Sequence, residues 1–308
     1  MILVASANGD VGMDAGWAIL SRGGPALDAV EAATREVERN ASDHTVGLGG
    51  YPNLIGEVEL DASIMDGVTR QAGCVGALRG YVHAITVARA VLERLPHVLV
   101  VGDGAARLAE EIGLAREETL TDEARDVWQR GLDGTLTDEG LSARMLSAVA
   151  ALAADPDHAA GTVNFLAIDG GGGMASAVST SGWAWKYPGR LGDSPVIGAG
   201  NYCDVRYGAA ACTGFGELAI RSGTARRVVD GLAHGESLAD ACADAIADLY
   251  DLGVPPERMI MHSVAIDATG SHHGVTTDVD GSAAYLVRQD GMDAFERLPR
   301  TVISSPQP

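Results

Sequence analysis

The chain has 308 residues, 46% of them hydrophobic, which is enough to bury a sizeable core in one large domain or two small ones. Its formal net charge of −20 argues against binding to nucleic acid or to anionic membrane surfaces. No apolar run approaches the roughly 20 residues that span a bilayer, and the N-terminus has no basic segment typical of a signal peptide. We therefore expect a cytoplasmic protein without nucleic-acid or membrane partners.

The first 111 residues predict alternating short strands and helices, with glycine-rich turns between them. We expect strands at 2–6, 57–65, 74–78 and 98–101, helices at 14–20, 25–39, 83–95 and from 105, a turn at 8–10 and a loop at 45–56. The sequence Gly102-Asp103-Gly104 resembles part of a dinucleotide fingerprint, but Arg107 takes the place of the third glycine. It predicts a strand-to-helix turn instead.

Residues 115–161 are rich in acidic side chains and include several glycines. This composition predicts a mobile connector that ends at Gly161, with a helical stretch over Leu141 to Ala153.

The C-terminal half begins with a predicted hairpin, in which a strand from Thr162 and a strand ending at Thr180 are joined by the glycine-rich turn 170–173. Helices follow at 217–232 and 238–249, and then strands at 259–266, 273–278 and 283–288. Because strands and helices come in blocks without regular alternation, the order favours an α+β fold over a doubly wound sheet.

The cysteines and histidines show no pattern of a metal or disulfide site. There is no C-x-x-C pair, and three of the cysteines are flanked by small or apolar residues, which predicts reduced core residues: Cys74, Cys203, Cys212 and Cys242. His272-His273 lacks accompanying ligands at metal spacing and predicts surface strand residues. We expect neither a metal nor a cofactor.

The junction Gly161-Thr162 is where the sequence indicates chemistry. A threonine hydroxyl is a poor nucleophile unless a base takes its proton. Cleavage before Thr162 would give it a free α-amine, whose pKa of roughly 7.7–8.0 allows it to act as that base. Gly161 suits such a cleavage, because a residue without Cβ tolerates a strained backbone.

Several motifs at fixed spacing resemble the N-terminal-nucleophile threonine amidohydrolases, the family of isoaspartyl peptidase/L-asparaginase and glycosylasparaginase. They include Thr45-Val46-Gly47-Leu48-Gly49-Gly50, Glu59 to Gly67, Gly189-Arg190-Leu191-Gly192-Asp193-Ser194-Pro195 and Cys212-Thr213-Gly214-Phe215-Gly216. The resemblance covers most of the chain. It implies a four-layer αββα sandwich over residues 1–308 as a single domain, cut into an α subunit 1–161 and a β subunit 162–308, and a homodimer of cleaved units.

The resemblance also implies a role for each matched residue. Thr162 would be the nucleophile freed by autocleavage at Gly161-Thr162, and Thr180 would hydrogen-bond it. Arg190 would hold the α-carboxylate of an asparagine-type substrate, and Asp193 would bind its α-ammonium. The remaining pair, Thr213 and Gly214, would form the oxyanion hole and contact the substrate.

Each of these residues also has a plainer interpretation from its type and spacing. Thr162 and Thr180 are ordinary strand residues by propensity. Arg190 and Asp193, three residues apart in a loop, form a solvated ion pair in that interpretation. Thr213-Gly214 would then be a turn before a helix. The single lysine, Lys186, is assigned no role.

The chain departs from the family pattern at four positions. Asn164 stands where glycine is common, and its side chain would crowd or polarise the site. Gly161 is similar to the asparaginase/isoaspartyl peptidase branch, whereas glycosylasparaginases have aspartate at this position. Ala7 and Phe215 replace an aromatic residue and a polar residue. The leading hypothesis is hydrolysis of the side-chain amide of asparagine, of N4-substituted asparagine or of a β-aspartyl bond. The alternatives are acyl transfer, or an amidase of specialised metabolites, by the same residues, and an uncleaved, inactive binding protein.

Overall fold

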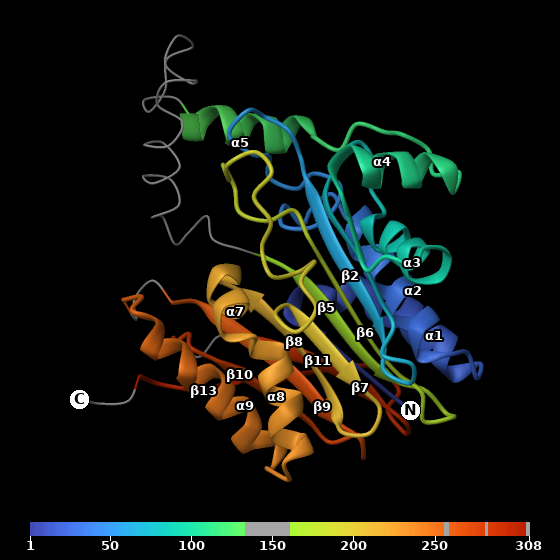
Figure 1. Cartoon of the computed structure of the whole chain (residues 1–308), viewed down its shortest axis with the longest axis vertical. Helices are drawn as coiled ribbons and strands as arrows, with labels where there is room; N and C mark the ends of the chain where they lie inside the picture. The colour runs from blue at the N-terminus through green and yellow to red at the C-terminus, as the bar shows by residue number, and fades with distance from the viewer. Residues whose placement is uncertain (133–160, 256–258, 281–282, 306–308) are drawn as a thin grey trace.

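The computed structural model describes residues 1–132, 161–255, 259–280 and 283–305. Two β-sheets stack face to face, and helices cover the outer face of each sheet (Figure 1). This arrangement is α+β, as the blocks of strands and helices predict.

Within the described residues the first sheet has eight strands, with the N-terminal strand in its interior. Their spatial order is β12 (Glu296–Pro299), β11 (Ala284–Gln289), β1 (Ile2–Ser6), β5 (Val163–Ile168), β6 (Met174–Thr180), β2 (Leu60–Asp66), β3 (Ala72–Leu78) and β4 (Leu99–Val101). The pairs are antiparallel except β3 with β4. The hairpin of β5 and β6 is therefore flanked by strands from the N-terminal half.

The second sheet is built from the C-terminal half of the chain. Its five strands follow the order β13 (Thr301–Val302), β10 (His272–Thr276), β9 (Met261–Asp267), β8 (Gly208–Gly214) and β7 (Asn201–Asp204). Strands β7 and β8 pack against β5 and β6 of the first sheet. All residues of both strands are buried, and those of β8 are mostly alanine and glycine, which allows the two sheets to approach closely at this point.

The helices divide between the two sheets. Against the first sheet lie α1 (Asp10–Ser21), α2 (Ala26–Arg39), α3 (Ala84–Arg94) and α4 (Gly102–Glu111), and against the second lie α7 (Gly216–Ser222), α8 (Thr224–Ala233) and α9 (Leu238–Ala247) (Figure 1). Short 3₁₀ segments, η1 (Ala7–Gly9) and η3 (Asp248–Leu252), precede α1 and follow α9.

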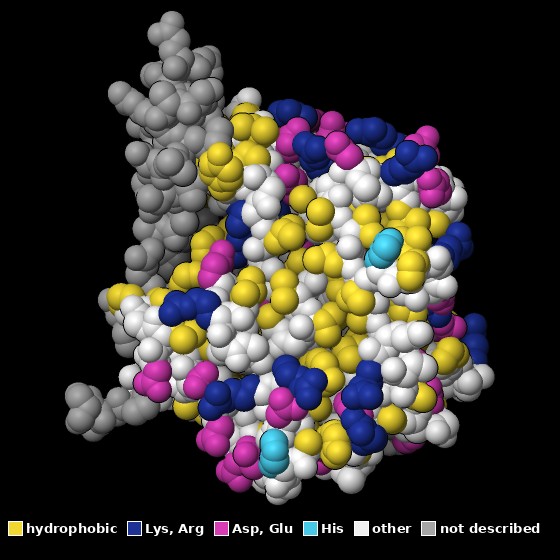
Figure 2. Space-filling view, viewed as in Figure 1, with side chains coloured by type: hydrophobic (Ala, Val, Ile, Leu, Met, Phe, Trp, Pro, Cys, Tyr) yellow, Lys and Arg dark blue, Asp and Glu magenta, His cyan; other side chains and the backbone are white. Residues whose placement is uncertain are grey.

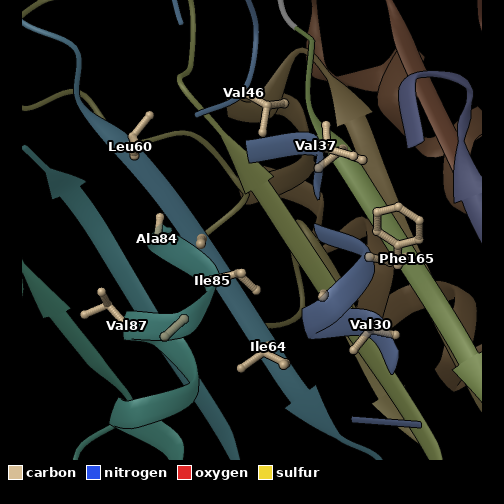
Figure 3. Close-up of a cluster of buried hydrophobic side chains, with 14 of the residues drawn as sticks. Val30, Val37, Val46, Leu60, Ile64, Ala84, Ile85, Val87 and Phe165 are labelled. Atoms are coloured by element: carbon tan, nitrogen blue, oxygen red, sulfur yellow. The ribbon is translucent and has the colours of Figure 1, made fainter. Parts of the chain in front are cut away.

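Helix α2 shows why these segments fold as they do. Its residues at helical spacing, Ala26, Val30, Ala33 and Val37, are buried, which gives one apolar stripe. Figure 3 shows Val30 and Val37 lying between the helix and the sheet, beside Phe165 of β5. This core fixes the position of β5, the strand that follows Thr162.

The outer surface carries both signs of charge. On the face shown in Figure 2, acidic and basic side chains gather over α4 and along α8 and α9, with uncharged surface between them. Within the part of the chain that the structure describes, no helix combines the length and the apolar character needed to cross a bilayer.

Several sequence predictions are confirmed. Strands 2–6, 74–78 and 98–101, helices 25–39, 83–95 and 238–249, and the hairpin from Thr162 to Thr180 all form to within a few residues. All four cysteines are buried and free of disulfides. His272 and His273 lie on β10 and are half-buried.

Other boundaries were wrong. Strand β2 begins at Leu60 rather than at Glu57, and the expected turn at 8–10 is the η1 segment that leads into α1 at Asp10. Helix α4 begins at Gly102, so the glycine-rich sequence is the first turn of that helix.

The acidic connector was also misjudged in part. Residues 122–132 form the helix α5 (Asp122–Leu132), with two acidic residues in its first turn and Arg130 in its last, which complements the helix dipole. Trp128 of this helix packs against Gly56. The helix expected over Leu141 to Ala153 lies outside the described residues.

The C-terminal half contains elements that the sequence did not reveal. The helix expected over 217–232 is broken at Gly223, whose φ of 65° suits a residue without Cβ. Strand β8 was missed because alanine and glycine have weak strand propensity, and the short strands β7, β12 and β13 were missed as well.

The crossing of α1 over α2 gives a stability prediction. A Cβ at Gly12 would lie 2.2 Å from the backbone carbonyl oxygen of Ala33, so Gly12→Ala must push the helices apart. We expect a loss of about 1–3 kcal/mol in the free energy of unfolding. Thermal and denaturant unfolding would measure it, with Gly170→Ala as control, since a Cβ at Gly170 meets no atom closer than 3.8 Å. Equal stability of the two variants would contradict this account of the contact.

Candidate active site

The Gly161–Thr162 junction lies at the start of β5. Thr162 is buried, with 6% of its surface exposed. Gly161 packs so closely against Thr45 that a Cβ would lie 2.0 Å from the Thr45 hydroxyl oxygen. Only glycine fits at this position, and the junction is held against the loop that follows α2.

Thr180 reaches the same junction from the end of β6. The pairing of Val163 with Ser179 puts Thr180 beside Thr162, one step beyond the ladder. The Thr180 hydroxyl donates to the carbonyl oxygen of Gly161 at 2.9 Å and accepts from the N–H of Gly182 at 2.9 Å. In the uncleaved chain the Thr180 hydroxyl thus binds the carbonyl of the residue that precedes Thr162, and its bond to a freed Thr162 stays a prediction.

Thr45 is itself held by a polar chain that sequence reasoning did not assign. Its carbonyl accepts from the N–H of Ser181 at 2.7 Å, and its N–H and hydroxyl both donate to Asp43. The second oxygen of Asp43 accepts from the side-chain amide of Asn8 at 2.9 Å. In the sequence, the Thr45-Val46-Gly47 motif marked one member of this series of hydrogen bonds, but it gave no indication of Asp43.

Asn164 does not project freely into the site, contrary to the expectation of crowding. Its side-chain oxygen accepts from the N–H of Ser6 at 3.1 Å, and its own N–H donates to the Ser6 hydroxyl at 3.1 Å. These two bonds extend the pairing of β1 with β5 by one residue. The Asn164 side chain thus takes the place of a backbone hydrogen-bond partner between the two strands.

Thr213 and Gly214 end strand β8 and are not a free turn. Gly214 has a φ of 124°, and a Cβ there would lie 2.2 Å from the carbonyl oxygen of Ile260. Thr213 is 6% exposed. Among the described residues neither its hydroxyl nor that of Thr162 has a hydrogen-bond partner, so both remain available to a bound molecule.

Arg190 is paired with Glu217, at the start of α7, rather than with Asp193. Its Nε and Nη2 donate to the two carboxylate oxygens at 2.9 and 2.8 Å. The guanidinium also lies over the Trp183 ring, 4.5 Å from the ring centre. Because two of its three nitrogens are engaged, Nη1, which faces Gly182 and Gly192, is the one left for a ligand.

Asp193 is a buried carboxylate with an unused oxygen. Its residue surface is 4% exposed, and Oδ2 has no hydrogen-bond partner among the described residues. Burial raises the pKa of this carboxyl to about 7, against the attraction of Arg190. A buried acid without a partner is suited to receive a cation.

Two aromatic rings line this side of the site. Trp183 and Phe215 pack with their ring centres 5.1 Å apart, tilted by 56°. Sequence reasoning singled out Phe215 but not Trp183. Ala7, where the family pattern has an aromatic residue, lies in η1.

Contacts connect the predicted residues in one neighbourhood. Gly182, next to the Thr180 turn, lies against the Arg190 guanidinium. Gly216, two residues after Gly214, lies against Asp193. The end of β6, the 190–193 loop and the end of β8 therefore lie in one neighbourhood. Thr180, at the end of β6, connects this neighbourhood to the Gly161–Thr162 junction.

Other features of the described residues lie apart from this neighbourhood. A surface hollow of about 1140 Å³ lies beside α4, and Arg79, Glu110 and Arg116 are among its lining residues, whereas the predicted site residues are not. Across residues 1–132, 161–255, 259–280 and 283–305, no three Asp, Glu, His or Cys side chains gather in a way that would hold a metal ion.

Comparison with known proteins identifies the family. The model of a family described as asparaginase matches residues 10–292. An N(4)-(beta-N-acetylglucosaminyl)-L-asparaginase from Elizabethkingia miricola is 39% identical over 230 residues, which is 75% of this chain and 63% of that protein. The isoaspartyl peptidase/L-asparaginase of Mus musculus is 36% identical over 75% of this chain and 67% of its own length.

A third relative covers more of the chain. The plant-type L-asparaginase of Thermococcus kodakarensis is 35% identical over 282 residues, 92% of this chain and 89% of that protein. Since the family model spans nearly the whole sequence, the chain belongs to the asparaginase family.

Proposed function

We propose that the protein is an amidohydrolase that cleaves the side-chain amide of asparagine, of N4-substituted asparagine or the β-aspartyl bond of a peptide. The nucleophile is Thr162, freed by cleavage of the Gly161–Thr162 bond. The observation that carries the proposal is the buried junction, where the Gly161 carbonyl accepts a hydrogen bond from Thr180 and Gly161 packs on Thr45. The relatives named above, described as asparaginases and an isoaspartyl peptidase, support the same chemistry.

The first reaction matures the chain. The Thr162 hydroxyl attacks the carbonyl carbon of Gly161, the peptide bond is exchanged for an ester, and water then hydrolyses that ester. The Thr180 hydroxyl, 2.9 Å from the carbonyl oxygen, stabilises the negative charge that develops there. Two chains result, 1–161 and 162–308, and we infer that they stay together in a four-layer αββα sandwich.

The second reaction turns over substrate. The freed amine of Thr162 takes the proton of its own hydroxyl as the oxygen attacks the side-chain carbonyl of the substrate. Thr213 and Gly214 stabilise the oxyanion, and ammonia or an amine leaves with the transferred proton. Water then hydrolyses the β-aspartyl ester and releases aspartate, restoring Thr162.

Charges hold the amino-acid part of the substrate. The α-carboxylate binds Nη1 of Arg190, which Glu217 and Trp183 hold in place, and the α-ammonium pairs with Asp193. The role of an uncleaved binding protein loses its main support, because the Asn164 side chain bonds to Ser6 rather than crowding the site.

We predict that the purified protein separates on a denaturing gel into fragments of residues 1–161 and 162–308. N-terminal sequencing of the second fragment should begin at Thr162. The variant Thr162→Ala should remain a single chain, because no other hydroxyl replaces the attacking group. A wild-type chain that stays intact after long incubation would rule out self-cleavage.

Removal of the guanidinium tests the carboxylate site. Arg190→Ala should lower kcat/KM by a factor equivalent to about 2–5 kcal/mol, since a partly buried charge-assisted contact is lost. Arg190→Lys should restore only part, because an ammonium cannot keep the fork to Glu217. The cut at Gly161–Thr162 should persist in both variants. Arg206→Ala, which removes a half-exposed arginine paired with Asp204, serves as control, and normal turnover by Arg190→Ala would remove this binding model.

The raised pKa of Asp193, about 7, gives a pH prediction. Below this pKa the free site holds a neutral acid, and above it a carboxylate that attracts an ammonium, so affinity for L-aspartate should rise as pH increases through about 7. Calorimetric titration at several pH values would measure it. Succinate, which has both carboxylates but no amine, should not gain affinity over this range, and a parallel gain would show that Asp193 does not bind the ammonium.

A substrate panel tests the reaction class. Asparagine, β-aspartyl dipeptides and N4-glycosylated asparagine share the aspartyl part and differ in the leaving group. Because Ala7 replaces an aromatic residue of the family pattern and Phe215 follows the proposed oxyanion hole directly, we expect varied leaving groups to be accepted. N-acetylation of the α-amine should abolish hydrolysis, as it leaves the Asp193 charge without a partner. Efficient hydrolysis of the acetylated compound would overturn the substrate class.

A further inference from the structure

Lys186, the only lysine among 22 lysine and arginine residues, lies inside the protein beside the proposed site. Its surface is 3% exposed, and its ammonium nitrogen donates to the backbone carbonyl of Glu59 at 3.0 Å. Burial lowers the pKa of Lys186, while the nearby Asp61 carboxylate opposes that effect. A buried lysine with so few partners is costly and calls for a reason.

Glu59 extends the contact to the substrate-binding loop. Its carboxylate accepts the N–H of Gly189 with both oxygens, at 3.1 and 3.0 Å. Gly189 directly precedes Arg190. The Lys186 ammonium therefore holds the backbone of Glu59, and the side chain of Glu59 holds the backbone next to Arg190, which closes the 186–189 segment into a small ring of contacts.

The space around the ammonium suits lysine and not arginine. Gly182 lies between the two cations, and a Cβ there would be 3.0 Å from the Lys186 nitrogen and 3.4 Å from Nη1 of Arg190. A planar guanidinium at position 186 would need the room that Gly182 and Arg190 occupy.

The Asp61 carboxylate offsets the repulsion between the Lys186 and Arg190 cations. It is fully buried, one of its oxygens accepts from the N–H of Ala77 at 2.8 Å, and the other has no hydrogen-bond partner among the described residues. Burial raises the pKa of Asp61, and Lys186 and Arg190 both counter that rise. The pairing of β2 with β6 sets Asp61 opposite Thr180, the residue whose hydroxyl binds the Gly161 carbonyl.

We propose that Lys186 is a positioning residue for substrate binding: through Glu59 and Gly189 it fixes the place of Arg190, and Asp61 balances its charge. The inference rests on the proposed function, since it assigns Lys186 a part in holding the substrate carboxylate. Lys186 makes no contact with Gly161 or Thr180 in these interactions, so it acts on binding and not on maturation.

The test uses Lys186→Met, Lys186→Arg, Glu59→Gln and the double variant Lys186→Met/Glu59→Gln of the full chain. With whichever amide of the panel the wild-type protein hydrolyses, each variant should raise KM about 10- to 100-fold, because Arg190 is displaced. We expect kcat to change less than about threefold and the Gly161–Thr162 cut to occur normally. The double variant should have a KM no higher than that of the more affected single variant, because Lys186 and Glu59 position Arg190 through the same series of contacts.

Arg300→Met provides a matched control. Arg300 is also a buried cation that donates to backbone carbonyls, those of Ser263 and Ala284, but none of these hydrogen bonds reaches residues 186–193. Its loss should lower the melting temperature without raising KM.

Unchanged KM in folded Lys186→Met, or fully additive effects in the double variant, would overturn the proposal. If Lys186→Met does not fold, Glu59→Gln decides in the same way by its KM. Absence of turnover by the wild-type protein on every panel compound would instead overturn the proposed function, and this inference with it.

Discussion

The close packing of Gly161 between two threonines is the constraint on which the rest of the site depends. Thr45 touches Gly161 where a side chain would otherwise lie, and Thr180 holds the carbonyl oxygen of that residue. These contacts come from three separate segments: the loop after α2, the end of β6 and the start of β5. The hydrophobic core between α2 and β5 holds these segments in place. The geometry of the junction therefore depends on the stability of the first sheet.

The charged side chains of the site differ in exposure, with Asp193 buried and the Arg190–Glu217 pair partly exposed. Glu217 and Trp183 hold Arg190 before any substrate arrives, whereas Asp193 keeps an oxygen unpaired. The Arg190 cation is thus held in place before a ligand binds, whereas the free oxygen of Asp193 would gain a partner only from a ligand. Preorganisation of this kind lowers the cost of binding, because fewer groups must be ordered at the moment of contact. The proposed pairing of Asp193 with the α-ammonium would make the recognition of an α-amino acid depend on pH, because the pKa of Asp193 is raised to about 7.

Much of the fold was predictable from local pattern. The apolar stripe of α2 and the turn between β5 and β6 gave those elements directly, because helical and strand periodicities are strong signals. Strand β8 was not predictable in this way. Its alanines and glycines carry no strand preference, and they are present because two sheets approach closely there, which is a tertiary cause. The acidic α5 was missed because its charges dominate its composition, although they suit the ends of a helix.

The site shows the same division. Motif spacing pointed to Thr162, Arg190 and Asp193, but it did not indicate Glu217 and gave Glu59, which lies in a matched motif, no role. Glu217 and Glu59 act through contacts with segments distant in the sequence, so no local pattern could reveal their partners. The bond from Thr180 to Gly161 and the bond from Asn164 to Ser6 were likewise visible only in three dimensions.

The most direct measurement of the central claim is the chemical identity of the acylated residue. Rapid acid quenching during turnover, followed by mass spectrometry of peptides, would locate the β-aspartyl group. The account predicts this group on the hydroxyl of an N-terminal Thr162, in a peptide that begins at that residue, and its disappearance as substrate is exhausted. Turnover with the aspartyl group on another residue, or with Thr162 still joined to Gly161, would contradict it.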